Sequence, residues 1–255
     1  MKVREYGSGG STLIVLHGIL GSSKNWHTIA GKLAQSRYVL VPDLRNHGNS
    51  PHGPHSIEAM CDDLYRLLLD YDIKRTDILG HSMGGLVAMQ FAFKYSRKLD
   101  HLIIEDIAPN VNNKMILRLV QYMQALKLDQ ISSRADADTM LSQYITDIPV
   151  RRFVIQNLKL KQNQSYAWQV NLPNIVTFLH DAVFELPKDE THQGPTLFMA
   201  GELSDHNILA QKEEIIKLFP NVTFKSIAGA GHWIHHDAQE EFLKTVEMFL
   251  TRGPA

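Results

Sequence analysis

The sequence predicts an α/β fold: a mostly parallel central sheet flanked by helices and interrupted by a helical insertion. Short apolar runs alternate with segments of helical periodicity up to residue 105, and the alternation resumes at residue 195. Strands that alternate with helices favour right-handed βαβ units and therefore a parallel sheet. Residues 110–193 look helical throughout, with no clear strand. We therefore predict a core formed by residues 1–109 and 194–255, and a helical cap formed by residues 110–193.

The first part of the core shows the alternation most clearly. Apolar runs closed by Gly, Pro or Asp predict buried strands, and apolar residues at helical spacing predict the helices between them. Ser56 is placed as the N-cap of the first long helix. The expected elements are strands at residues 13–16, 38–41, 77–79 and 99–105, with helices at residues 56–71 and 86–95.

The insertion and the C-terminal part follow. Helices are expected in the insertion at residues 114–128, 135–145, 150–160 and 175–184. A strand at 195–200, a helix at 208–218 and a strand at 222–227 complete the core. The last helix is expected to start at Asp237, which forms a capping-box pattern with Glu240.

Composition excludes several classes of protein. The chain carries 26 Lys plus Arg against 27 Asp plus Glu, so it lacks the basic excess of a protein that binds nucleic acid through phosphates. The single Cys61 excludes an intramolecular disulfide and a CxxC motif. No apolar run approaches the length of a membrane span, and the first residues lack the apolar stretch of a signal peptide. We expect a cytoplasmic location, and nothing in the sequence indicates an oligomeric state.

The segment Gly80-His81-Ser82-Met83-Gly84 matches the pattern G-x-S-x-G. It follows a predicted strand and opens a predicted helix, which is the setting of a nucleophile elbow. The glycines are required because the sharp turn brings neighbouring chain too close for side chains. Ser82 would then lie at the positive end of a helix. The pattern predicts Ser82 as a nucleophile; the alternative is an ordinary glycine-rich loop.

A serine hydroxyl needs a base to remove its proton. Of 13 histidines, His232 is the best candidate, because it follows the last predicted strand and fits the chain order Ser, Asp, His. His81 is adjacent to Ser82 on a tight turn, where the two side chains rarely meet. His235 and His236 are expected to be solvated at the start of the last helix.

Two carboxylates could orient the base. Asp106 and Asp205 each follow a predicted strand, at the sheet edge where ligands bind in open α/β folds. The residues alone leave this choice open.

Two backbone N–H groups should stabilise an oxyanion. The predicted donors are the N–H groups of Met83, which follows the nucleophile, and of Ile19. Ile19 lies in an early strand–loop segment with His17, Gly18 and Leu20.

Five segments together resemble the α/β-hydrolase superfamily, and within it the YbfF-type esterases, whose animal relatives are the ABHD11-like hydrolases. They are residues 16–22, 43–50, 80–85, 106–109 and 229–233. The resemblance implies that Asp106 is the acid. It also implies that Ser204 matches a serine close to the histidine, whereas Asp205 beside it departs from the family pattern. Activity on acyl esters or thioesters, without a cofactor, is a further implication.

Several residues of the loops and the cap are predicted to support the substrate. Arg45 either contacts the substrate or fixes its own loop, and Trp233 adjoins the base. The loop that carries His47, His52 and His55 lacks carboxylates at ligand spacing, so no metal site is predicted. Apolar residues of the insertion either form a roof over the nucleophile or pack the cap's own core: Met115, Leu119, Val120, Met123, Leu126, Phe153, Trp168, Phe178 and Phe184.

These observations predict a serine hydrolase that cleaves carboxylic acyl esters, or acyl thioesters, through an acyl-enzyme on Ser82. One alternative is a cofactor-free lyase or a C–C hydrolase on the same frame, in which the serine and histidine move a proton. The other is a member of the fold that binds a ligand without catalysis.

Overall fold

A computed structural model describes residues 1–111, 113–181 and 190–251 of the chain. Its main sheet has seven strands in the order β1-β3-β2-β4-β5-β8-β9. All neighbouring pairs are parallel except β1 and β3. The predicted mostly parallel sheet is therefore confirmed. The strands are β1 (Lys2–Tyr6), β2 (Thr12–Leu16), β3 (Tyr38–Asp43), β4 (Thr76–His81), β5 (Leu99–Glu105), β8 (Thr196–Gly201) and β9 (Val222–Ile227).

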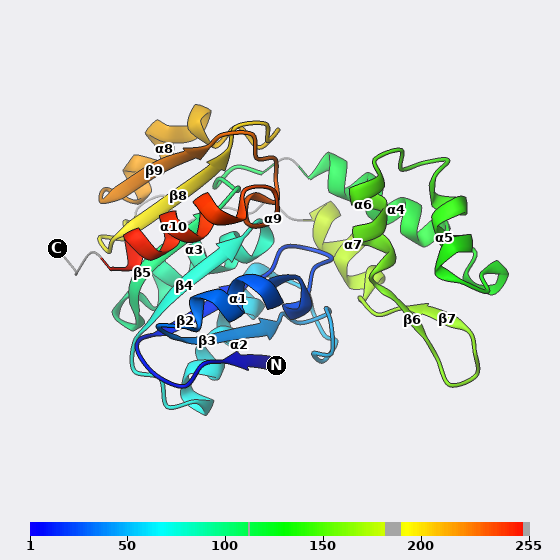
Figure 1. Cartoon of the computed structure of the whole chain (residues 1–255), viewed down its shortest axis with the longest axis horizontal. Coiled ribbons are helices and arrows are strands. Elements are labelled where there is room, and N and C mark those ends of the chain that lie inside the picture. Colours follow the sequence, from blue (N-terminus) through cyan, green and yellow to red (C-terminus); the bar gives the residue numbers. More distant parts are fainter. Residues whose placement is uncertain (112, 182–189, 252–255) are drawn as a thin grey trace.

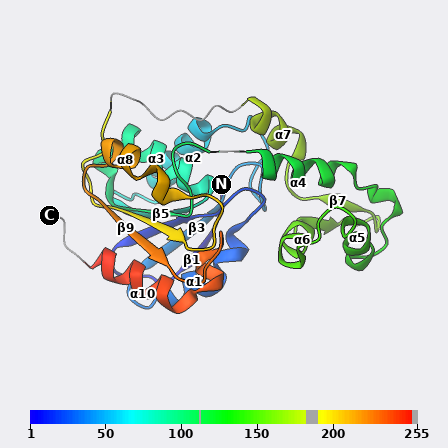
Figure 2. The same cartoon turned by 90° about the horizontal axis from the view of Figure 1, so that it is seen from above.

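Helices cover both faces of this sheet (Figures 1 and 2). Along β2, Leu13 and Val15 pack with the helices of one face, and Ile14 and Leu16 with those of the other. This alternation follows from the two-residue period of a strand. One face carries α1 (His27–Leu33), α9 (Ile234–Asp237) and α10 (Gln239–Leu250), and the other carries α2 (Ile57–Asp70), α3 (Met83–Lys94) and α8 (Lys212–Leu218).

The predicted capping box of the last helix is wrong. The chain forms the short α9 and then begins α10 after Ala238, without a side-chain cap. The carboxylate of Asp237 accepts a hydrogen bond from the N–H of Gly231 at 3.0 Å instead. Asp237 thus stabilises the loop after β9 rather than a helix terminus.

The insertion lies between β5 and β8 and forms a separate lobe beside one end of the sheet (Figure 1). It contains a small hairpin, in which Leu158 pairs with Trp168, so the expectation of an insertion without strands is wrong. The helix expected over 150–160 ends early because the chain turns back through a polar segment at residues 161–165. The elements are α4 (Lys114–Ala125), α5 (Arg134–Leu141), α6 (Ile148–Ile155), β6 (Leu158–Leu160), β7 (Tyr166–Trp168) and α7 (Leu172–Asp181).

Short 3-10 helices connect several of these elements. They are η1 (Ser23–Trp26), η2 (Ser96–Lys98), η3 (Leu128–Gln130) and η4 (Ile208–Gln211), the last of which splits the helix expected over 208–218.

Cys61 is buried in α2. In the part of the chain that the structure describes, every helix is too short or too polar to cross a membrane. The cap boundaries at 110 and 193 stay a prediction, and Phe184 lies outside the described residues.

Candidate active site

The turn between β4 and α3 presents Ser82 in a strained conformation. Its φ of 52° and ψ of −121° place it in the left-handed region, which is rare for a residue with a side chain. The predicted need for glycine is confirmed, because a Cβ on Gly80 would lie 2.3 Å from the Gly84 carbonyl oxygen. One on Gly84 would lie 2.5 Å from the Leu16 carbonyl oxygen. Ser82 is the residue just before the first turn of α3.

The structure brings His232 and Asp106 together. His232 Nδ1 donates to Asp106 Oδ2 at 2.8 Å. Asp106 is completely buried, and its carboxylate also accepts hydrogen bonds from the Gly201 N–H and the Ser204 hydroxyl. Asp205 is exposed, and in the described structure neither a hydrogen bond nor an ion pair links it to His232. Of the two carboxylates left open above, only Asp106 contacts the base.

His81 joins the elbow to the loop that carries His232. Its Nε2–H donates to the His232 carbonyl oxygen at 2.9 Å, and the two ring centroids lie 4.6 Å apart. Burial, together with the neighbouring His232 and His235, holds the pKa of His81 well below its ordinary value. Ser82 Oγ forms no hydrogen bond to His232 among the described residues; such pairs often tighten only when substrate binds.

The expectation that His235 is solvated is wrong. Its ring is buried and stacks on Trp26 at 4.2 Å. Nδ1 and the backbone N–H of His235 both donate to Glu105 Oε1 at 2.8 Å. The turn of α9 therefore folds onto the end of β5, whereas His236 stays exposed as predicted. Sequence reasoning missed Glu105 because its partner lies 130 positions away.

The loop after β2 lies directly against the elbow. A Cβ on Gly18 would come within 3.1 Å of Ser82 Cβ. The Leu20 N–H donates to His47 Nε2 at 3.1 Å, so it is already engaged. In the described structure the N–H groups of Ile19 and Met83 have no hydrogen-bond acceptor. Met83 follows Ser82 in the chain, and Ile19 follows Gly18, which lies against Ser82.

His17 and His47 hold this loop in place. Each Nδ1 faces a backbone carbonyl, which only accepts, so each must carry its proton on Nδ1. Each Nε2 then accepts a backbone N–H, from Leu44 at 2.9 Å for His17 and from Leu20 for His47. Burial is the main cause that lowers the pKa of both rings. His17 is therefore a neutral cross-link in the described structure.

Arg45 fixes its own loop. Its guanidinium pairs with Asp63 at 2.7 Å and donates to the Pro54 carbonyl at 2.8 Å. The neighbouring Asp43 accepts the N–H groups of Ser23 at 2.7 Å and Asn49 at 2.8 Å. Of the two predicted roles of Arg45, these contacts support the structural one.

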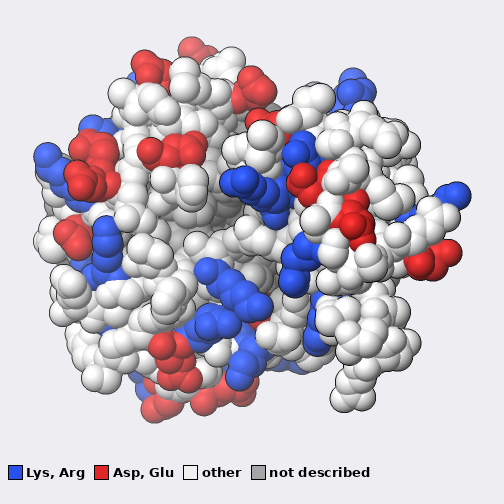
Figure 3. All heavy atoms as spheres, turned by 45° about the vertical axis from the view of Figure 1, so that its right-hand side comes forward, with Lys and Arg blue, Asp and Glu red and all other residues white. Residues whose placement is uncertain are grey.

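The cap contacts the site through α6. Phe153 packs on Trp233 with ring centroids 5.3 Å apart, and Asn157 Nδ2 donates to the Leu20 carbonyl at 2.9 Å. A hollow separates the two lobes in Figure 3, and Lys and Arg side chains border it. The cap thus contacts the residue that follows the base on one side and the loop of Leu20 on the other.

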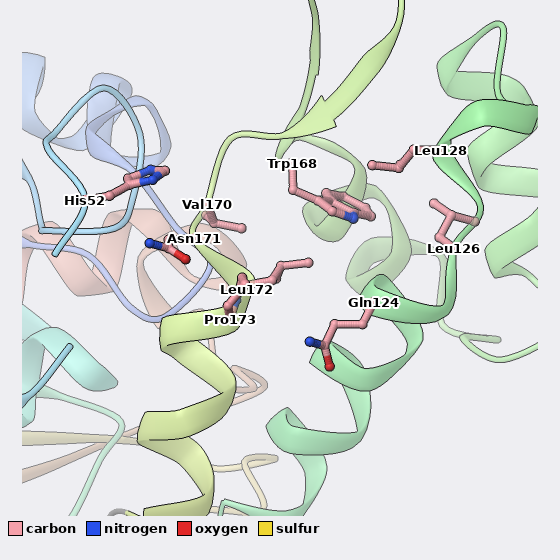
Figure 4. Close-up of a pocket in the computed structure, with 9 residues that line it drawn as sticks. All are labelled: His52, Gln124, Leu126, Leu128, Trp168, Val170, Asn171, Leu172 and Pro173. Carbon is pink, nitrogen blue, oxygen red and sulfur yellow. The ribbon is translucent and has the colours of Figure 1, made fainter. Parts of the chain in front are cut away.

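Most of the predicted roof residues pack the cap's own core. Val120, Met123 and Leu126 are buried there, whereas Met115 is exposed. Trp168 donates to the Met123 carbonyl at 3.1 Å and lines a pocket of about 410 Å³ between the end of α4 and the start of α7 (Figure 4). No residue of the elbow or of the His232 loop lines this pocket. Trp168 therefore faces a pocket that neither the elbow nor the His232 loop lines.

Among the residues that the structure describes, two groups of side chains have the composition of a metal site. One is His81, Glu105 and His235; the other is Asp106, His206 and His232. In both groups a carboxylate oxygen already accepts a ring N–H, so the same atoms serve as hydrogen-bond partners. In the loop with three histidines, both nitrogens of His47 are engaged with backbone groups.

Comparison with known proteins agrees with this architecture. The model of the alpha/beta hydrolase fold family matches residues 11–239. The chain is 37% identical to the sn-1-specific diacylglycerol lipase ABHD11 of Danio rerio, over 96% of this chain and 80% of that protein. It is 27% identical to Esterase YbfF of Escherichia coli, over 94% and 93% of the two chains.

A solved structure described as a marine microorganism esterase superposes with a TM-score of 0.94 at 32% identity, and covers 97% of this chain and 98% of its own. Esterases and lipases thus match this chain over nearly its whole length, insertion included. The chain belongs to the α/β-hydrolase family and is a carboxylic-ester hydrolase.

Proposed function

We propose that this protein is a serine hydrolase that cleaves acyl esters through an acyl-enzyme on Ser82. The observation that carries the proposal is the hydrogen bond from His232 to the buried Asp106, in a loop that His81 ties to the Ser82 elbow. A nucleophile, a base and an orienting acid are the three parts that acyl transfer requires.

The groups of the site have distinct roles in this reaction. His232 Nε2 takes the proton of Ser82 as its Oγ attacks the acyl carbonyl carbon. Asp106 keeps the other ring proton on Nδ1 and stabilises the imidazolium that forms. The N–H groups of Ile19 and Met83 stabilise the oxyanion of the tetrahedral intermediate. His232 then protonates the leaving alcohol or thiol, and later activates the water that releases the acid.

Acyl esters of glycerol are the substrate class that we propose first. The ABHD11 relatives carry the name of diacylglycerol lipases, and they match this chain over at least 93% of its length. Thioesters are the second class, because the same steps release a thiol as readily as an alcohol. Independence from a cofactor and a cytoplasmic location stay predictions from the sequence.

The first experiment is hydrolysis of p-nitrophenyl esters from acetate to palmitate, with a diacylglycerol and an acyl thioester in parallel. Ser82→Ala should abolish turnover and labelling by a fluorophosphonate, while the exposed control Ser8→Ala keeps both. Turnover that persists in Ser82→Ala contradicts the proposal. Turnover without a trapped acyl-enzyme would instead indicate proton-transfer chemistry of the lyase type, and ligand binding without turnover a binding protein.

A further inference from the structure

The imidazole of His206 stacks on that of His232. Their ring centroids are 4.4 Å apart and their planes differ by 30°. His206 belongs to the loop after β8 and to none of the motifs in the sequence, so the sequence did not single it out. It is half-buried, and its ring contacts the base rather than the elbow.

The loop of His206 is also tied to the acid. The His206 N–H donates to Ser204 Oγ at 3.3 Å, and the Ser204 hydroxyl donates to Asp106 Oδ2. The same Oδ2 accepts Nδ1–H of His232. One continuous set of hydrogen bonds therefore fixes the backbone of His206 relative to both Asp106 and His232. The stacked rings add a direct contact between His206 and His232.

The stacked ring is uncharged at neutral pH. Burial and the nearby His232 lower the pKa of His206 to about 4, against the opposing effect of Asp106 and Asp205. His232, Asp106 and Asp205 are the titratable groups that act on His206. A neutral aromatic face beside a ring that becomes cationic during catalysis is favourable, whereas a second cation there would repel it.

We propose that His206 is a positioning residue that holds the imidazole of His232 with Nδ1 toward Asp106. His206 contacts neither the nucleophile nor the oxyanion donors in the described structure, so its effect passes through His232. The inference rests on the proposed function for its kinetic consequence only. The orientation of the His232 ring can be measured without any substrate.

The kinetic test compares His206→Ala with His206→Phe, which keeps a flat ring. A misplacement of about 1 Å in a catalytic group costs up to about 10²-fold in rate. We expect His206→Ala to lower kcat about tenfold with KM unchanged, and His206→Phe to stay within about threefold of the wild type. The matched control is His236→Ala, since His236 is exposed and packs on no ring of the site.

The substrate-free test follows the proton on His232 Nδ1 by one-dimensional NMR. A proton shared with a buried carboxylate gives a separate downfield resonance when the ring is held. We expect this resonance in the wild type and in His206→Phe, and its loss by solvent exchange in His206→Ala. If His206→Ala lowers the melting temperature, His206→Leu replaces it in both tests, because leucine fills the space without a ring.

Three results overturn the inference. They are wild-type kcat in His206→Ala, an unchanged Nδ1 resonance in that variant, or equal losses in the alanine and phenylalanine variants. If the wild type hydrolyses no ester, the proposed function fails, but the NMR comparison still decides whether His206 orients His232.

Discussion

Asp106 shows how one residue can serve a site at a cost to local structure. It has a φ of 51°, in the left-handed region, and its side chain is completely buried. Burying a carboxylate is unfavourable unless hydrogen bonds replace water. The donors from Gly201, Ser204 and His232 provide that replacement. A side chain with this surrounding has little freedom, which suits a group that orients a base.

The two carboxylates near the base should differ sharply when each is neutralised. We expect Asp106→Asn to lower kcat by about 10⁴-fold, because an amide can stabilise the wrong tautomer of the base. Asp205→Asn, at an exposed position, should stay within about twofold, since surface substitutions have small effects. The measurement is kcat with a p-nitrophenyl ester. A nearly full rate for Asp106→Asn beside an inactive Asp205→Asn would reverse the assignment.

The sequence predicts single residues where a motif fixes their surroundings. Ser82 follows from its elbow, and His232 from its place after the last strand. The residues alone left the choice between Asp106 and Asp205 open, and the family resemblance implied Asp106. The contact itself is seen only in three dimensions, because Asp106 and His232 are 126 positions apart. His206 was missed, and His235 was wrongly expected to be solvated, for the same reason. Their partners come from other elements, which no local pattern reveals.

At the scale of elements, the elbow depends on a close approach between a strand, a turn and a helix. Gly80, near the end of β4, packs on Gly84, and Gly84 packs on the end of β2. Most strands and helices of the core were predicted, since their apolar periodicity is strong. The β6–β7 hairpin was not, because strands of three residues are too short to show an alternation.

Gly80→Ala should remove activity and destabilise the fold. Its methyl group would lie 2.3 Å from a backbone oxygen, which has no flexible side chain to move aside. Gly31→Ala is the matched control, because Gly31 lies inside α1 with nothing near its Cβ position. It should raise the free energy of unfolding by about 0.5–1 kcal/mol. Urea denaturation measures the free energy of unfolding of both variants. A stable and active Gly80→Ala variant would contradict the prediction.

At the scale of the molecule, amide side chains and backbone groups connect the cap to the core. Asn157 binds the Leu20 carbonyl, the Asn171 N–H binds the Asn46 carbonyl, and Asn174 binds the Gly53 carbonyl. Two of these contacts reach the loop that follows β3, and the third reaches the loop that carries the proposed oxyanion donor. The lobes therefore meet at the loops that also shape the site.

Three buried histidines, two of them in those loops and one at the end of β4, should make the stability of the whole protein depend on pH. His17, His47 and His81 are buried, and burial lowers the pKa of each below the ordinary value of 6.5. In the unfolded chain they regain that ordinary value, so the unfolded state binds more protons below about pH 6.5. Their contribution to stability is complete above pH 6.5 and is lost as the pH falls toward their folded pKa values.

We expect the free energy of unfolding to fall between pH 7 and pH 5 by up to about 1.4 kcal/mol per pH unit for each of these histidines. His47→Gln keeps a group that can donate and accept a hydrogen bond, but it does not titrate in this range. In this variant the free energy of unfolding should fall less steeply with decreasing pH than in the wild type, by about the contribution of one histidine. His236→Gln, at an exposed position, should leave the slope unchanged. Urea denaturation at half-unit pH intervals measures these slopes, and equal slopes for wild type and His47→Gln would show that His47 does not stay neutral in the folded protein.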